Sequence, residues 1–126
     1  MTQTLVFRRI VLVLWILSIV TTIVVSLTPR LTLPLDFWNA DKLYHGATYA
    51  WLGALPLWAF ASGDRGRTAG YSMVLLGALL EVAQMYVPGR SASLGDAVAN
   101  ALGVFAGMWL SERFMACCRG RRGLGG

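Results

Sequence analysis

Charged side chains are scarce in this sequence. Only 13% of its 126 residues are charged, whereas 56% are hydrophobic and the mean hydropathy is +0.60. A soluble domain carries roughly 25% charged residues. Because long uncharged runs account for the shortage, the sequence predicts an integral membrane protein rather than a soluble domain.

Several reactive residue types are also nearly absent. The two cysteines, Cys117 and Cys118, are adjacent, so no disulfide framework is expected. His45 is the single histidine, and the lack of a His-x-x-x-His spacing argues against zinc. No Gly-x-Ser-x-Gly motif or phosphate-binding glycine loop occurs. We therefore expect no metal ion and no cofactor.

The net charge of +5 does not indicate a nucleic-acid partner. The basic residues lie at the ends of apolar runs, and they form no patch interleaved with aromatic rings. Such a placement is typical of membrane topology signals. The expected partner is therefore the lipid bilayer.

Four stretches are long enough to cross a bilayer, which takes about 20 mostly apolar residues. We expect all-α structure, with membrane helices over residues 8–28, 42–62, 68–88 and 94–115 of a single domain (1–126), and a flexible tail at 119–126. The first stretch has the basic start of a signal peptide. It is longer than the usual apolar region of such peptides, however, and no A-x-A site follows it. An uncleaved helix is the preferred interpretation.

The distribution of Lys and Arg predicts the orientation. With the N-terminus inside, eight basic residues fall in inner segments and three in outer segments, namely Arg30, Lys42 and Arg90. Both termini are therefore expected in the cytoplasm. The short polar stretch 62–67 is expected to form a tight inner turn.

Polar side chains gather at the outer end of the expected helices. On helical spacing, the second, third and fourth helices each carry one polar stripe. The stripes are Asp41, His45 and Tyr49; Gly77, Glu81, Gln84 and Pro88; and Asp96, Asn100, Gly103 and Gly107. Arg90 lies in the outer turn that joins the last two. These three helices are predicted to pack through small residues around an outward-facing polar cluster, with the first helix as a supporting wall.

The same residues carry a resemblance to the VanZ-like family of small bacterial membrane proteins. The strings concerned are Asp41-Lys42-x-x-His45-x-x-x-Tyr49, then Glu81-x-x-Gln84, Pro88-Gly89-Arg90, Ser93, Asp96, Asn100, Gly103 and Gly107. The chain departs from the family at Gly46, where an aromatic residue often follows the histidine. The resemblance implies a multi-pass protein of the bacterial cytoplasmic membrane. The founding member of the family is associated with low-level resistance to the glycopeptide antibiotic teicoplanin.

We interpret the polar cluster as a candidate ligand site. Its eight residues are Asp41, Lys42, His45, Glu81, Gln84, Arg90, Asp96 and Asn100. Arg90 and Lys42 suit a phosphate or carboxylate, and His45 with Glu81 are the candidate acid and base. The expected ligand is a lipid headgroup, a lipid-linked wall precursor or a glycopeptide.

Each of these residues also has a purely structural interpretation. Asp41 and Asp96 suit helix N-caps. Glu81 could form an ion pair with Arg90 or share a proton with His45. Three functions therefore stay open: a non-catalytic membrane factor that binds an envelope lipid or precursor, an enzyme acting on a lipid headgroup or isoprenoid phosphate, and an assembly protein whose polar cluster only joins helices.

Overall fold

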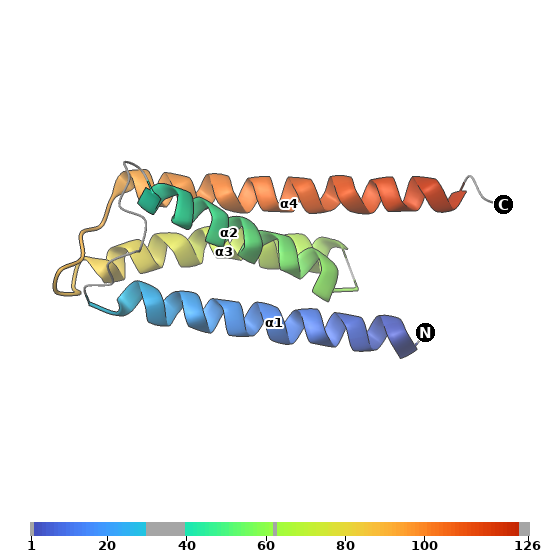
Figure 1. Ribbon diagram of the computed structural model, residues 1–126, viewed down its shortest axis with the longest axis horizontal. Helices are drawn as coiled ribbons and strands as arrows, with labels where there is room; N and C mark the ends of the chain where they lie inside the picture. The colour runs from blue at the N-terminus through green and yellow to red at the C-terminus, as the bar shows by residue number, and fades with distance from the viewer. Residues whose placement is uncertain (1, 30–39, 62, 124–126) are drawn as a thin grey trace.

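In the part of the chain that the structure describes, four helices run alternately up and down. The computed structural model describes residues 2–29, 40–61 and 63–123. Its elements are α1 (Thr2–Leu27), α2 (Ala40–Ala59), α3 (Gly63–Gln84) and α4 (Leu94–Gly123). The start of α1 and the end of α4 lie at the same end of the molecule (Figure 1). All-helical structure is confirmed.

The helix bounds differ from those expected at both ends of the molecule. α1 begins at Thr2, and α4 continues to Gly123, into the segment predicted to be a flexible tail. α3 begins at Gly63, within the stretch predicted as a turn. The physical reason is that hydropathy marks the part of a helix that avoids water, whereas Arg and Glu extend the same helix into water at little cost. Residues 124–126 lie outside the described part of the chain.

At the opposite end, α3 is shorter than expected. It stops at Gln84, so Pro88 does not belong to the polar stripe of this helix. Turns follow, with hydrogen bonds from Val87 N to Gln84 O and from Arg90 N to Val87 O, both 3.1 Å. Gly89 has a φ of 79°, which glycine adopts without steric cost. Most of the expected outer segment after α1, including Arg30, lies outside the described residues.

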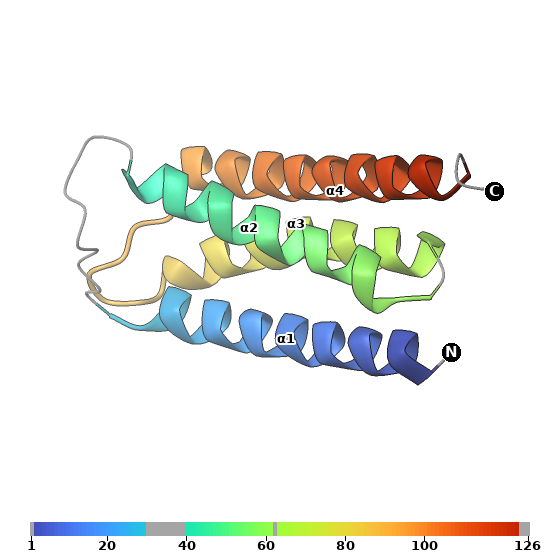
Figure 2. The same ribbon diagram turned by 45° about the vertical axis from the view of Figure 1, so that its right-hand side comes forward.

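α2 lies obliquely between the other helices (Figure 2). Its closest partner is α4, and glycines make the approach possible. A Cβ at Gly107 would collide with the backbone of Ala50, and one at Gly103 with the backbone of Gly46. The predicted packing role of the small residues on α4 is confirmed.

A second contact of α2, with α1, depends on a proline inside the helix. Pro56 is fully buried inside the helix and has no N–H with which to bond the carbonyl of Leu52. The indole N–H of Trp15, on α1, donates to that carbonyl at 2.9 Å. Trp15 also packs against the buried residues of α2, so one side chain joins α1 to the core.

Two of the four helices are long and apolar enough to cross a membrane. They are the segments Thr4–Leu27 in α1, with a mean hydropathy of 2.8, and Leu94–Arg119 in α4, with 1.2. All four helices expose large apolar side chains, most densely along α1. α2 carries Asp41, Lys42 and His45 in its first two turns, and α3 carries Asp64, Arg65 and Arg67 in its first two.

Candidate functional site

The polar residues singled out by the sequence converge at one end of the bundle. Asp41 and His45 lie in the first turns of α2, while Glu81 lies in the last turn of α3. Asp96 and Asn100 lie in the first turns of α4. The predicted meeting of these side chains is confirmed by their contacts, described below. Their binding of a ligand stays a prediction.

The innermost part of the cluster is a buried hydrogen-bonded group. Asn100 is 2% exposed, and His45 Nδ1 lies 2.9 Å from its Oδ1. Because an amide oxygen only accepts, Nδ1 carries the proton of the imidazole. Glu81 is also buried, with Oε1 3.8 Å from His45 Nδ1 and Oε2 accepting from Ser93 N at 3.3 Å. These contacts join α2, α3 and α4.

Arg90 does not pair with Glu81, which was one structural interpretation of this carboxylate. Its Nε donates to Thr28 O at 3.2 Å and its Nη2 to Val25 O at 2.9 Å. Gln84 Nε2 donates to Ser26 O at 3.1 Å. The last carbonyls of a helix have no intrahelical partner and carry partial negative charge, so a guanidinium and an amide are suitable donors.

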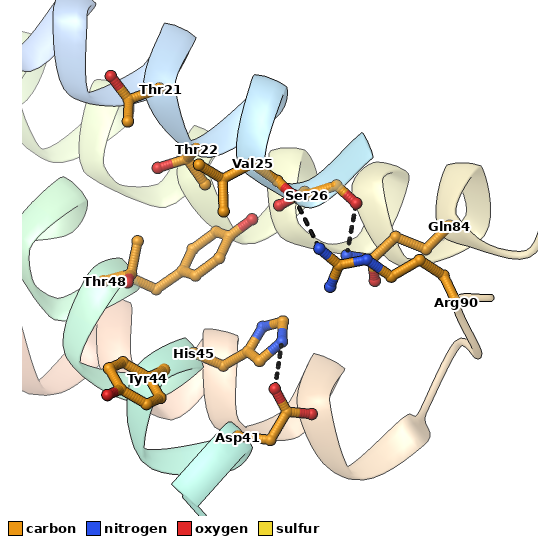
Figure 3. A pocket seen from close by; sticks show the side chains of 11 residues that line it. Thr21, Thr22, Val25, Ser26, Asp41, Tyr44, His45, Thr48, Gln84 and Arg90 are labelled. Carbon is orange, nitrogen blue, oxygen red and sulfur yellow. Dashed lines mark hydrogen bonds and ion pairs between the residues drawn. The ribbon is translucent and has the colours of Figure 1, made fainter. Parts of the chain in front are cut away.

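α1 therefore contributes to the candidate site, which adds to the supporting role predicted for this helix. A cavity of about 230 Å³ lies between α1, the polar end of α2, the end of α3 and Arg90 (Figure 3). Figure 3 shows that the imidazole of His45 and the guanidinium of Arg90 both border this cavity. Its lining residues are Thr21, Thr22, Val25, Ser26, Asp41, Tyr44, His45, Thr48, Tyr49, Gln84 and Arg90.

The eight predicted site residues separate into two groups. Asp41, His45, Gln84 and Arg90 line the cavity, whereas Lys42, Glu81, Asp96 and Asn100 do not. The sequence analysis missed Thr48 and the hydroxyls of α1. Thr48 follows His45 by three positions and therefore shares its helical face. Thr22 and Ser26 of α1 are spaced i, i+4 and also share a face, but they carry no charge and so gave a weaker signal.

Neither aspartate occupies the N-cap position that their structural interpretation assigned. α2 begins at Ala40 and α4 at Leu94, so Asp41 and Asp96 both lie inside the first turn. At the start of α4, Ser93 O accepts from Asp96 N at 3.0 Å and from Ala97 N at 3.1 Å. A carboxylate in the first turn still interacts favourably with the helix dipole.

Asp96 has an unusual environment for a carboxylate. The residue is 5% exposed, and its Oδ1 accepts no hydrogen bond from any described residue. The nearest cation is Lys42 Nζ at 3.8 Å, on a side chain that is 47% exposed. Asp41, His45 and Asp96 each offer one ligand atom, and these atoms lie within 4.8 Å of one another. Among the described residues, these three therefore form a group that could hold a metal ion. The sequence analysis predicted no metal ion.

Comparisons of the chain with protein-family models, with curated proteins and with solved structures found no match.

Proposed function

We propose that this chain is a VanZ-like protein of the bacterial cytoplasmic membrane, with four membrane spans and both termini in the cytoplasm. Large apolar side chains are exposed along all four helices. Soluble monomers rarely expose large contiguous apolar patches. The start of α1 and the end of α4 share one end of the molecule (Figure 1). Arg8 and Arg9 lie near the start of α1, and Arg113 lies in the second half of α4. Basic residues favour the cytoplasmic side.

The lower hydropathy of α2 and α3 does not oppose four spans. α2 buries Leu52, Leu55 and Leu57 against its neighbours, so the other helices shield much of it from lipid. In its first two turns, His45 contacts Asn100 of α4 and Glu81 of α3. Asp41 and Lys42 are exposed at the end of the helix. A helix enclosed in this way needs less apolar surface than one that faces lipid on most sides.

We propose that the cavity binds the phosphate-bearing headgroup of an envelope lipid or lipid-linked wall precursor at the outer leaflet. The observation that carries this proposal is a cavity that Arg90, His45 and several hydroxyls line, within an otherwise apolar surface. Arg90 supplies a fixed positive charge, and several hydroxyls and His45 supply further hydrogen-bonding groups. The guanidinium of Arg90 has five N–H groups, and its bonds to Val25 O and Thr28 O use two of them.

The size of the cavity limits the ligand. Pockets for drug-sized molecules have volumes of roughly 300–1,000 Å³. At about 230 Å³, this cavity accepts a headgroup but does not enclose a glycopeptide antibiotic. A contribution to teicoplanin resistance would then come from binding the precursor or lipid that the drug requires, rather than from binding the drug.

The buried group supports a structural role for part of the cluster. Asn100 and Glu81 already have partners on other helices, so their first role is to fix α2, α3 and α4. An enzymatic role has less support. His45 Nδ1 and Glu81 Oε1 are 3.8 Å apart, beyond the roughly 2.6–3.2 Å of a direct proton transfer.

The test is lipid binding by the full chain in nonionic detergent. Native mass spectrometry with phosphatidylglycerol and, separately, undecaprenyl phosphate distinguishes a phospholipid from a wall-precursor carrier. Arg90→Gln should weaken binding about tenfold or more, because a charge-assisted hydrogen bond contributes roughly 1.5–3 kcal/mol. Thr48→Leu should weaken it by filling the cavity while all charges stay in place.

Arg113→Gln is the matched control, because Arg113 lies on α4 over the ring of Trp109 and away from the cavity. It should bind lipid as the wild type does. Equal binding by wild type, Arg90→Gln and Thr48→Leu, with unchanged thermal stability, would show that lipid adheres to the apolar surface alone. In a teicoplanin-susceptible host, the wild type should raise the inhibitory concentration and Thr48→Leu should not; no rise over empty vector contradicts the resistance role.

A further inference from the structure

We propose that Asp41, His45 and Asp96 form a site for a divalent transition-metal ion next to the cavity. The three residues come from the first turns of two different helices, α2 and α4. One ligand atom from each lies within 4.8 Å of the other two. Figure 3 shows the contact between His45 and Asp41 at one side of this group.

Asp96 provides the first reason to place a cation here. Its Oδ1 is buried and accepts no hydrogen bond from the described residues. A buried carboxylate oxygen that lacks a partner is costly, because it has lost its water without replacement. Lys42 at 3.8 Å compensates only in part, since that distance exceeds a hydrogen bond and its side chain is half exposed. A metal ion bound at Oδ1 would supply the missing partner.

His45 provides the second, independent reason. Its Nδ1–H donates to Asn100 Oδ1 at 2.9 Å, which leaves the lone pair on Nε2. Nε2 is the nitrogen that faces Asp41, with Oδ1 at 3.8 Å. A histidine that binds a metal usually donates its other ring N–H to a carbonyl or carboxylate oxygen, which fixes the tautomer and the ring orientation. In this protein, Asn100 Oδ1 is the oxygen that accepts from the second ring nitrogen.

The ligand atoms must move closer together around an ion, since the three lie within 4.8 Å of one another. Ligands of a tetrahedral zinc ion, with bonds of about 2.0–2.1 Å, lie roughly 3.4 Å apart. His45 and Asp41 are within about half an ångström of that separation. Asp41 can complete the movement, because its side chain is 59% exposed. Lys42 must turn away, and its exposure permits this.

The ligand set selects the class of metal. One imidazole with two carboxylates suits zinc, manganese or iron better than calcium or magnesium, which prefer oxygen ligands alone. Three protein ligands leave at least one coordination position open. If the proposed headgroup binds in the cavity, its phosphate oxygen is the natural fourth ligand. This last step rests on the proposed function, whereas metal binding itself does not.

The experiment is a Co²⁺ and Zn²⁺ titration of the full chain in detergent, without added lipid. Cys117 and Cys118 are exposed thiols that also bind these ions, so both are first replaced by serine. The cysteine-free protein should bind about one ion per chain. Co²⁺ should give the intense visible absorption of a four- or five-coordinate site, which octahedral Co²⁺ in solution lacks.

Three variants decide the assignment. Asp41→Asn and Asp96→Asn should each weaken Co²⁺ binding at least tenfold, and Lys42→Met should strengthen it by removing the competing ammonium group. Asp64→Asn is the control, since Asp64 is an exposed carboxylate in the first turn of α3, at the other end of the bundle. It should leave the Co²⁺ affinity unchanged.

Unaltered Co²⁺ affinity and spectra in both aspartate variants would overturn the proposal. If Asp96→Asn fails to fold, Asp41→Asn decides alone, because its exposed side chain contributes little to packing. Weak binding that Lys42→Met does not improve would also overturn it, because Asp96 would then bind no metal even without the competing ammonium group. Because no lipid is present, a negative result here leaves the lipid-binding experiment intact, and the converse also holds.

Discussion

At the scale of single residues, the main feature is donation to backbone carbonyls that have no helical partner. Trp15 donates to the carbonyl freed by Pro56, while Gln84 and Arg90 donate to the last carbonyls of α1. The sequence indicated that Gln84 and Arg90 belong to a polar site. It did not indicate their acceptors, because a free carbonyl is a property of a helix end and not of any side chain.

The Trp15 contact should depend on the presence of Pro56. Trp15→Phe leaves Leu52 O unpaired and should lower the free energy of unfolding by about 1–2 kcal/mol. In a Pro56→Ala background, the N–H of Ala supplies Leu52 O from within the helix, so Trp15→Phe should cost clearly less. Chemical unfolding in detergent of the four proteins gives the coupling as a double-mutant cycle.

The matched control is Trp51→Phe, which removes a hydrogen bond from Trp51 Nε1 to Ser18 Oγ of 3.1 Å. That contact does not involve the carbonyl freed by the proline, so its loss should cost the same in both backgrounds. If Trp15→Phe also costs the same in both, the indole stabilises α1 only through its packing.

At the scale of elements, the contact of α2 with α4 is set by glycine. The Gly-x-x-x-Gly spacing at 103 and 107 identified this face of α4 from sequence. α2 meets it with the backbones of Gly46 and Ala50, which have the same small-x-x-x-small spacing. The sequence contains several such pairs, so spacing alone does not say which two faces meet.

Gly107→Ala should therefore destabilise the protein, although alanine favours helix by about 1 kcal/mol. The added methyl group collides with the backbone of Ala50, and separating two packed helices costs roughly 1–3 kcal/mol or more. Gly46→Ala is a control at the same interface, since its Cβ would lie 3.7 Å from Ala99 O, an ordinary contact. Thermal unfolding should show a lower Tm for Gly107→Ala and an equal or higher Tm for Gly46→Ala. The reverse order would mean that the two helices can separate without cost.

At the scale of the whole molecule, the sequence predicted the number and order of the helices but not their ends. Hydropathy finds the apolar middle of each helix. It cannot see that α1 and α4 extend well beyond it, because their terminal turns are polar. It also could not show that α1 closes one side of the cavity. That arrangement depends on Arg90 and Gln84 reaching α1 from segments more than fifty residues away.

The proposed topology can be measured with the native cysteines. Cys117 and Cys118 are exposed near the end of α4, while Ser91 is exposed in the connection between α3 and α4, at the opposite end of the bundle. With four spans and a cytoplasmic C-terminus, a membrane-impermeant maleimide should reach the native cysteines only after spheroplasts are lysed. A Ser91→Cys variant without the native cysteines should be labelled in intact spheroplasts.

The mass of the purified chain completes this experiment, because α1 alone would also suit a cleaved signal sequence. An intact mass near 13.7 kDa, with the two labelling patterns above, supports α1 as a resident helix. Loss of the first helix would remove the α1 carbonyls that Arg90 and Gln84 contact, and with them one side of the cavity. A shorter mature chain would therefore contradict the topology and the lipid site together, whereas labelling of the native cysteines in intact spheroplasts would contradict the orientation alone.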